Sequence, residues 1–167
     1  MASNHTSRPS SAAASTTFSP AGEKNTPPIA QLPSFLGGAP SATHLVVLIH
    51  GLWGKPEHMH SIARNLRARY PADNLYLHCA TAYSGLRTYD GVEHGGERVC
   101  AEVEALMAER TGGGGGDSEG ITPFDKISVV GYSMGGLVAR YMVGLLEAKG
   151  VLAQMRCMVG FVFFSSR

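Results

Sequence analysis

A serine between two glycines is the part of this sequence best suited to do chemistry. Gly131, Ser133 and Gly135 form a G-x-S-x-G pattern, which directly follows the predicted buried strand at 126–130 (K-I-S-V-V) and directly precedes a stretch with helical spacing. A sharp turn from a strand into a helix exposes a serine hydroxyl, and it needs small residues two positions away because larger side chains would collide. Ser133 is therefore the candidate nucleophile. The backbone N–H of Met134, at the start of the helix, is a candidate oxyanion donor.

A second turn with a glycine predicts the other half of the same site. His50, Gly51 and Leu52 follow the apolar, largely β-branched run at 45–49, which is typical of a strand buried on both faces. If this strand lies beside the strand before the serine, both turns open at one edge of the sheet, and the N–H of Leu52 becomes the second oxyanion donor. We interpret His50 as a residue that fixes its turn by a hydrogen bond, not as the general base. Trp53 either lines an acyl pocket or packs the turn.

These turns need a sheet wrapped by helices to position them. From Thr43 onward, short apolar runs alternate with amphipathic stretches, which predicts an α/β domain with a mostly parallel sheet over residues 43–167. The expected strands lie at 45–49, 75–79 and 126–130, the expected helices at 56–70, about 92–110 and 134–148, and a last apolar run at 158–164. The outer face of the second helix is expected to carry Glu97, Glu102, Glu104 and Glu109.

Two segments lack the composition of folded elements. Residues 1–40 are dominated by Ser, Thr, Ala and Pro, and they are predicted to form a disordered tail because they offer little apolar surface to bury. Residues 111–120 contain five successive glycines, which predicts a flexible loop. A phosphate-binding loop would need Lys-Ser or Lys-Thr behind it, and neither follows.

Composition argues against several function classes. A formal net charge of +1 on 167 residues provides no field that would gather nucleic acid. There is no C-x-x-C spacing among the three cysteines, Cys79, Cys100 and Cys157, which are expected to be buried, reduced thiols. The two neighbouring histidines, His58 and His60, are two positions apart on a predicted helix and therefore face different ways. No metal site is predicted. No stretch reaches the about 18 apolar residues of a membrane-spanning helix and no secretory signal is recognised, so we expect a cytoplasmic protein.

The segments around the two turns resemble the eukaryotic putative serine esterase family (DUF676). The resemblance is carried by V-V-L-I-H-G-L-W-G-K-P-E-H-M at 46–59, Y-D-G-V-E-H-G-G-E-R-V at 89–99 and the run at 127–152, and it covers about residues 43–155. It implies a three-layer α/β-hydrolase fold, lipase-like action on carboxylic esters of acylglycerols or glycerophospholipids, and no cofactor. It also implies contact with a lipid-droplet or membrane surface, and it supports Ser133 as nucleophile and the turn after His50 as part of the oxyanion hole.

The sequence departs from this family beyond Met155. The family continues with Phe-Ala-Thr-Pro-His and later supplies a catalytic Asp and His, whereas neither Asp nor His follows Ser133 here. Hydrolases of this fold place the acid and the His after the serine, so we expect a partial fold, truncated after the strand that follows the nucleophile helix, with weak or no activity. One alternative is a non-catalytic protein that binds lipid or a partner on a degenerate hydrolase fold. A perhydrolase or thioesterase would share the same fold and turn.

Overall fold

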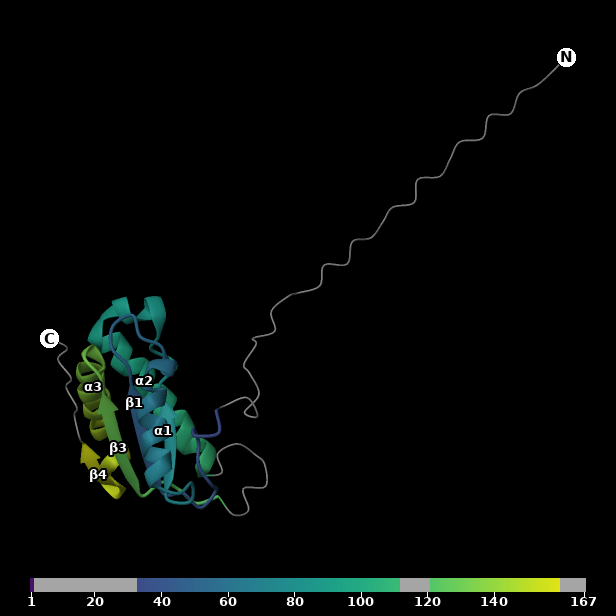
Figure 1. Ribbon diagram of the computed structural model, residues 1–167. Helices are drawn as coiled ribbons and strands as arrows, with labels where there is room; N and C mark the ends of the chain where they lie inside the picture. Colours follow the sequence, from purple (N-terminus) through teal and green to yellow (C-terminus); the bar gives the residue numbers. More distant parts are fainter. Residues whose placement is uncertain (2–32, 112–120, 160–167) are drawn as a thin grey trace. The chain divides into compact units, whose positions relative to one another are not determined.

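A parallel sheet of four strands carries the fold, in the spatial order β2-β1-β3-β4 (Figure 1). The strands are β1 (His44–Ile49), β2 (Leu75–Cys79), β3 (Lys126–Gly131) and β4 (Arg156–Val159). The computed structural model describes residues 1, 33–111 and 121–159. The predictions of a tail at 1–40 and a loop at 111–120 therefore fall largely outside the described residues, as does the last apolar run beyond Val159.

The strand before His50 lies directly beside the strand before Ser133. Strands β1 and β3 pair in parallel, and their register sets Ile49 opposite Gly131, so that both strands end at the same level. The predicted neighbour relation is confirmed. Because parallel strands present their carboxyl ends at one edge of the sheet, both following turns emerge there.

Helices cover both faces of this sheet and make three layers. Helix α1 (His60–Arg69) packs on one face, and α2 (Gly91–Arg110) and α3 (Met134–Ala148) pack together on the other (Figure 1). Three short 3-10 turns accompany them, η2 (Pro56–Met59), η3 (Gly85–Asp90) and η4 (Val151–Gln154). The predicted α/β class with a parallel sheet is confirmed. None of the described helices has the length and hydropathy needed to cross a membrane.

Strand β1 is the centre of two cores. Leu45, Val47 and Ile49 pack against α2 and α3, whereas Val46 and Leu48 pack on the α1 side, and all five are buried. A strand covered on both faces excludes water from every side chain, which is why this run has no polar residue. Each such side chain contributes about 1.5–3 kcal/mol when fully buried.

The first predicted helix needs a correction at its start. The segment predicted as a helix at 56–70 begins as the 3-10 turn η2 and becomes α-helical only at His60. In η2 the N–H of His58 donates to the carbonyl oxygen of Lys55 at 3.0 Å, a bond to the third residue back. Such tight turns are frequent at helix starts, and apolar periodicity does not distinguish them from the first α-helical turn.

The prediction that Glu102 lies on the outer face of α2 is wrong. Its carboxylate accepts hydrogen bonds from the backbone N–H groups of Thr81 and Ala82, at 2.9 and 3.0 Å, and from the Thr81 hydroxyl. His78 also donates to it, at 3.1 Å. The loop after β2 has backbone donors that need an acceptor, and Glu102 turns inward to supply one.

Two of the three cysteines behave as predicted. Cys79 and Cys100 are buried and form no disulfide, while the side chain of Cys157 lies outside the described residues. Burial raises the pKa of the Cys79 thiol to about 12, so that it remains protonated and unreactive at neutral pH.

Arg110 ends α2 and is buried, although it carries a charge. Its guanidinium lies over the rings of both Tyr76 and Phe124, 5.0 and 4.5 Å from their centroids, and the two rings contact each other edge to face. It also donates to three carbonyl oxygens, those of Ala39, Ala42 and Thr122. One side chain thus joins α2 to the segments that precede β1 and β3.

We expect Arg110→Ala to lower the free energy of unfolding by about 3 kcal/mol, because the substitution removes the guanidinium donor from the buried carbonyl oxygen of Ala42, two further hydrogen bonds and two ring contacts. Urea denaturation followed by circular dichroism measures the loss. Arg69→Ala, at an exposed position in the last turn of α1, is the matched control. Equal midpoints for the two variants would contradict the role given to Arg110.

Candidate active site

Ser133 sits in a strained turn between β3 and α3. Its backbone angles are φ 54° and ψ −126°, and the helix begins at the next residue. For a residue with a side chain, a positive φ of this kind costs about 1–2 kcal/mol. A serine held in this way at a strand-to-helix turn is the arrangement expected of a nucleophile elbow.

The flanking glycines are required by close approach of the backbone. A Cβ on Gly131 would lie 2.6 Å from the carbonyl oxygen of Gly135, and one on Gly135 would collide with the carbonyl oxygens of Ile49 and His50. The start of α3 therefore lies directly against the end of β1, with no side chain between them.

The turn after His50 lies against the serine itself. A Cβ on Gly51 would be 3.0 Å from the Cβ of Ser133 and 3.1 Å from the carbonyl oxygen of Tyr132. The N–H of Tyr132 donates to the carbonyl oxygen of Ile49 at 2.9 Å, which joins the two turns. The structure thus brings together the two segments singled out in the sequence.

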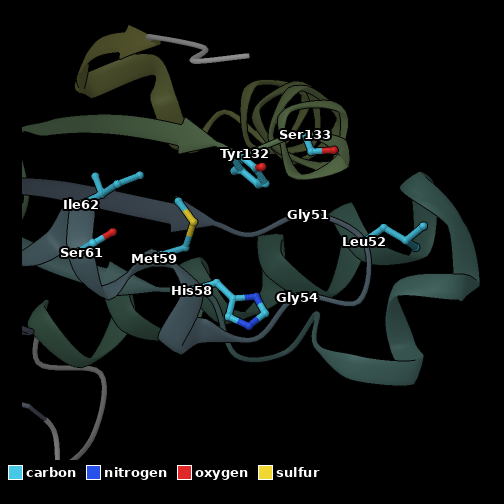
Figure 2. Close-up of a pocket in the computed structure, with 9 residues that line it drawn as sticks. All are labelled: Gly51, Leu52, Gly54, His58, Met59, Ser61, Ile62, Tyr132 and Ser133. Carbon is cyan, nitrogen blue, oxygen red and sulfur yellow. The ribbon is translucent and has the colours of Figure 1, made fainter. Parts of the chain in front are cut away.

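A pocket of about 460 Å³ opens where these turns meet (Figure 2). This volume falls within the range of about 300–1,000 Å³ that is usual for small-molecule sites. Apolar Leu52, Met59 and Ile62 contribute to its wall together with the polar side chains of Ser133, His58 and Ser61; the remaining lining residues are Gly51, Gly54 and Tyr132.

Comparison with protein families agrees with this geometry. A family model described as putative serine esterase (DUF676) matches residues 39–166. The chain belongs to the putative serine esterase family. The match runs past Met155, where the resemblance was expected to end, and β4 pairs in parallel with β3 in this region and so continues the sheet. No curated protein matches the chain. Family membership and fold together indicate a hydrolase.

The two backbone N–H groups predicted for the oxyanion hole are available. Among the described residues, neither the N–H of Leu52 nor that of Met134 has a hydrogen-bond acceptor. The first N–H groups of any helix lack a partner within it, so Met134 offers a donor by its position alone. That both bind an oxyanion stays a prediction.

His50 is buried in the turn and makes the hydrogen bond expected of it. Its Nδ1–H donates to the carbonyl oxygen of Gly51 at 3.1 Å, which assigns the proton to Nδ1 because a carbonyl can only accept. The ring stacks on Tyr83, with 5.4 Å between centroids and 12° between planes. Burial lowers the pKa of His50, so the imidazole is neutral at pH 7. It packs the turn rather than facing the Ser133 pocket, whose lining does not include it.

Sequence reasoning missed the support behind His50. Glu102 holds the loop that carries Tyr83, and Tyr83 in turn stacks on the imidazole. Burial alone would raise the pKa of Glu102, but hydrogen bonds from His78, Thr81 and Ala82 outweigh it and lower that pKa below its ordinary value. Glu102 and Tyr83 do not belong to a sequence motif, so their residue types and spacing gave no signal that they support the turn.

The hydroxyl of Ser133 has no base bound to it in the part of the chain that the structure describes. His58 lines the same pocket, but its Nδ1 accepts the N–H of Lys55 at 3.4 Å.

Among the described residues no group of three His, Cys, Asp or Glu side chains could hold a metal ion. Trp53 is not among the residues that line this pocket, and its ring packs edge to face on Tyr89.

We expect Gly135→Ala to destabilise the protein by about 3 kcal/mol or more, because the added methyl group meets two backbone carbonyl oxygens that cannot move independently. Gly144→Ala is the control on the same helix, since a Cβ there meets nothing within 4 Å. It should stabilise by about 0.5–1 kcal/mol, the usual gain of Ala over Gly in a helix. Thermal denaturation of both variants tests the pair, and a stable Gly135→Ala protein would contradict the close approach.

We expect stability to fall as the pH drops below about 6.5, the pKa of an unperturbed imidazole. Burial lowers the pKa of His50 and of His44, so the unfolded chain takes up protons that the folded chain does not bind. Each of the two histidines then lowers the free energy of unfolding by up to about 1.4 kcal/mol per pH unit, until the pH reaches the pKa that the histidine has in the folded protein. His50→Phe should reduce this slope without abolishing it, because His44 still contributes.

Urea denaturation between pH 7 and pH 5 measures the slope. His94→Phe removes an imidazole from an exposed helical position and should leave the slope as it is. An unchanged slope in His50→Phe would show that His50 is protonated in the folded state.

Proposed function

We propose that this chain carries the nucleophile and oxyanion-hole half of a serine hydrolase that acts on carboxylic esters of lipids. The observation that carries the proposal is the strained Ser133 turn packed directly against the Gly51 turn in one pocket. In this mechanism the Ser133 oxygen attacks the ester carbonyl carbon while its proton passes to a water molecule, because no base is bound to the hydroxyl among the described residues. The N–H groups of Leu52 and Met134 stabilise the negative oxygen that forms.

The remaining steps follow from acyl transfer. The tetrahedral intermediate collapses, the carbonyl bond re-forms and the alcohol leaves with a proton, which gives an acyl-serine ester. Water then attacks that ester and releases the carboxylic acid and the free serine hydroxyl. No step needs an oxidant, a reductant or a metal.

The pocket wall supports an acyl substrate. Met59 and Ile62 provide apolar surface along the wall of the pocket that Ser133 shares, and the cavity of about 460 Å³ leaves room for part of an acyl chain. Acylglycerols and glycerophospholipids present such a chain next to a carboxylic ester, and the family resemblance implies the same substrates.

We further propose that the chain turns over slowly. Without a base the serine hydroxyl stays protonated and is a poor nucleophile. The rate that the oxyanion hole and substrate binding support by themselves is about a thousandfold or more below that of a complete triad. The same observation favours a second candidate, a protein that binds lipid esters in this pocket without hydrolysing them. The two candidates differ in whether Ser133 forms a covalent acyl or phosphonyl product at all.

A fluorophosphonate probe with added imidazole separates these candidates. We expect slow labelling of Ser133 that imidazole accelerates at least tenfold, because a free base of that size can enter the pocket and accept the proton. Ser133→Ala should abolish labelling. Ser61→Ala removes the other serine of the same pocket and should label like the parent chain.

Mass spectrometry of the labelled peptide identifies the site. Absence of labelling at any imidazole concentration would favour the binding protein over the hydrolase. Rapid stoichiometric labelling without imidazole would instead show that the chain already holds a base for Ser133, and the proposal of slow turnover would be wrong.

A further inference from the structure

The direction of the Leu52 N–H is set through the peptide unit that it shares with Gly51. Every peptide bond in the described part of the chain is trans. A trans peptide unit is planar, so its N–H points opposite to its C=O. The carbonyl oxygen of Gly51 accepts the Nδ1–H of His50 at 3.1 Å and the N–H of Gly54 at 3.0 Å. These two hydrogen bonds therefore aim the predicted oxyanion donor.

His50 aims this peptide unit only while its ring stays in place, and Tyr83 holds the ring. The two rings stack with 5.4 Å between centroids, and both side chains are fully buried. A Cβ on Gly95 of α2 would lie 2.8 Å from the Tyr83 ring, so this ring packs directly on the helix backbone. The imidazole thus rests on a tyrosine that rests on α2.

The loop after β2 carries this tyrosine and is joined to the turn after β1 at two more points. We call residues 80–88 the β2 loop. The N–H of Gly85 donates to the carbonyl oxygen of Gly54 at 3.0 Å, and the N–H of Trp53 donates to the Thr88 hydroxyl at 3.1 Å. The position of the β2 loop therefore also sets the position of the turn after β1.

Glu102 anchors the β2 loop on the middle of α2. Its Oε1 accepts the N–H of Thr81 at 2.9 Å, and its Oε2 accepts the N–H of Ala82 at 3.0 Å. His78 donates to Oε1 at 3.1 Å. The carboxylate uses both oxygens, whereas an amide in its place has a single acceptor oxygen and would turn a donor toward the loop.

We propose that Glu102 is a positioning residue for the chemistry at Ser133. It holds the β2 loop, and the tyrosine of that loop holds the imidazole that aims the Leu52 N–H at the negative oxygen. Glu102 does not line the pocket, so it acts through these contacts and not on the substrate. The inference rests on the proposed function, in which the Leu52 N–H is an oxyanion donor.

A donor that points away from the negative oxygen loses much of its effect on the rate. Hydrogen bonds weaken steeply as the angle at the hydrogen departs from linear. Loss of one oxyanion-hole donor lowers kcat by about 10²–10³. A misdirected Leu52 N–H should lose part of that factor, which gives an expected decrease in rate of at least tenfold.

Glu102→Gln tests the proposal by fluorophosphonate labelling of Ser133 at a fixed imidazole concentration. We expect the maximal labelling rate to fall at least tenfold, while the probe concentration for half of that rate stays the same. The reason is that the donor stabilises the negative oxygen of the transition state rather than the bound probe. A residue that only stabilised the fold would change the fraction of protein that is labelled. Circular dichroism therefore accompanies the assay, at a temperature where both proteins are folded.

Three further variants serve as matched controls. Glu104→Gln makes the same charge change on α2, but Glu104 pairs with exposed Lys149 at 2.8 Å, so this variant should be labelled like the parent. Tyr83→Phe keeps the ring and removes a buried hydroxyl that has no hydrogen-bond partner, so it should also be labelled like the parent. Tyr83→Leu removes the stacked ring and should slow labelling as Glu102→Gln does.

The single tryptophan reports the same turn without any chemistry. The fluorescence anisotropy of Trp53 should fall in Glu102→Gln, because its turn gains mobility, and should stay unchanged in Glu104→Gln. A maximal labelling rate in Glu102→Gln equal to that of the parent overturns the proposal, whatever the anisotropy. If the parent is not labelled at any imidazole concentration, the proposed function fails. Anisotropy then decides the positioning of the turn alone, and equal values in the two variants overturn it.

Discussion

The contact between the end of β1 and the first turn of α3 is the constraint on which the site depends. Backbone meets backbone there, since a Cβ on Gly135 would collide with the carbonyl oxygens of Ile49 and His50. This approach places Gly51 against Ser133 and so brings two turns into one pocket. The burial of β1 on both faces stabilises the frame and offsets the strain that the serine turn stores.

The features predictable from the sequence are those that a local rule requires. A strand covered on both faces must be apolar throughout, which identified β1, and the serine turn needs glycines at fixed spacing. The 3-10 start of the first helix and the inward turn of Glu102 could not be predicted in this way. A carboxylate that accepts backbone N–H bonds has the same residue type and helical spacing as one in water. Only the path of the loop after β2 distinguishes them, and that path depends on contacts distant in sequence.

His50 shows why residue type alone misleads in such a site. An imidazole beside a catalytic serine suggests a general base, yet this ring is stacked on Tyr83 and uses its Nδ1 proton within the turn. Burial that lowers its pKa also keeps it neutral, so it fills space without adding charge behind the predicted oxyanion donors. Its support extends through Tyr83 to Glu102, so the shape of the turn after β1 depends on a residue in the middle of α2.

The two strained residues of the described chain, Ser133 and Trp53, belong to the two turns that meet in this contact. One holds its hydroxyl in the pocket, and the other holds its ring in solvent beside Tyr89. A turn whose only task was to position an oxyanion donor would not need a tryptophan in a left-handed conformation, because glycine adopts that conformation without cost. The same turn therefore combines a backbone N–H that has no acceptor among the described residues with a large side chain directed outward.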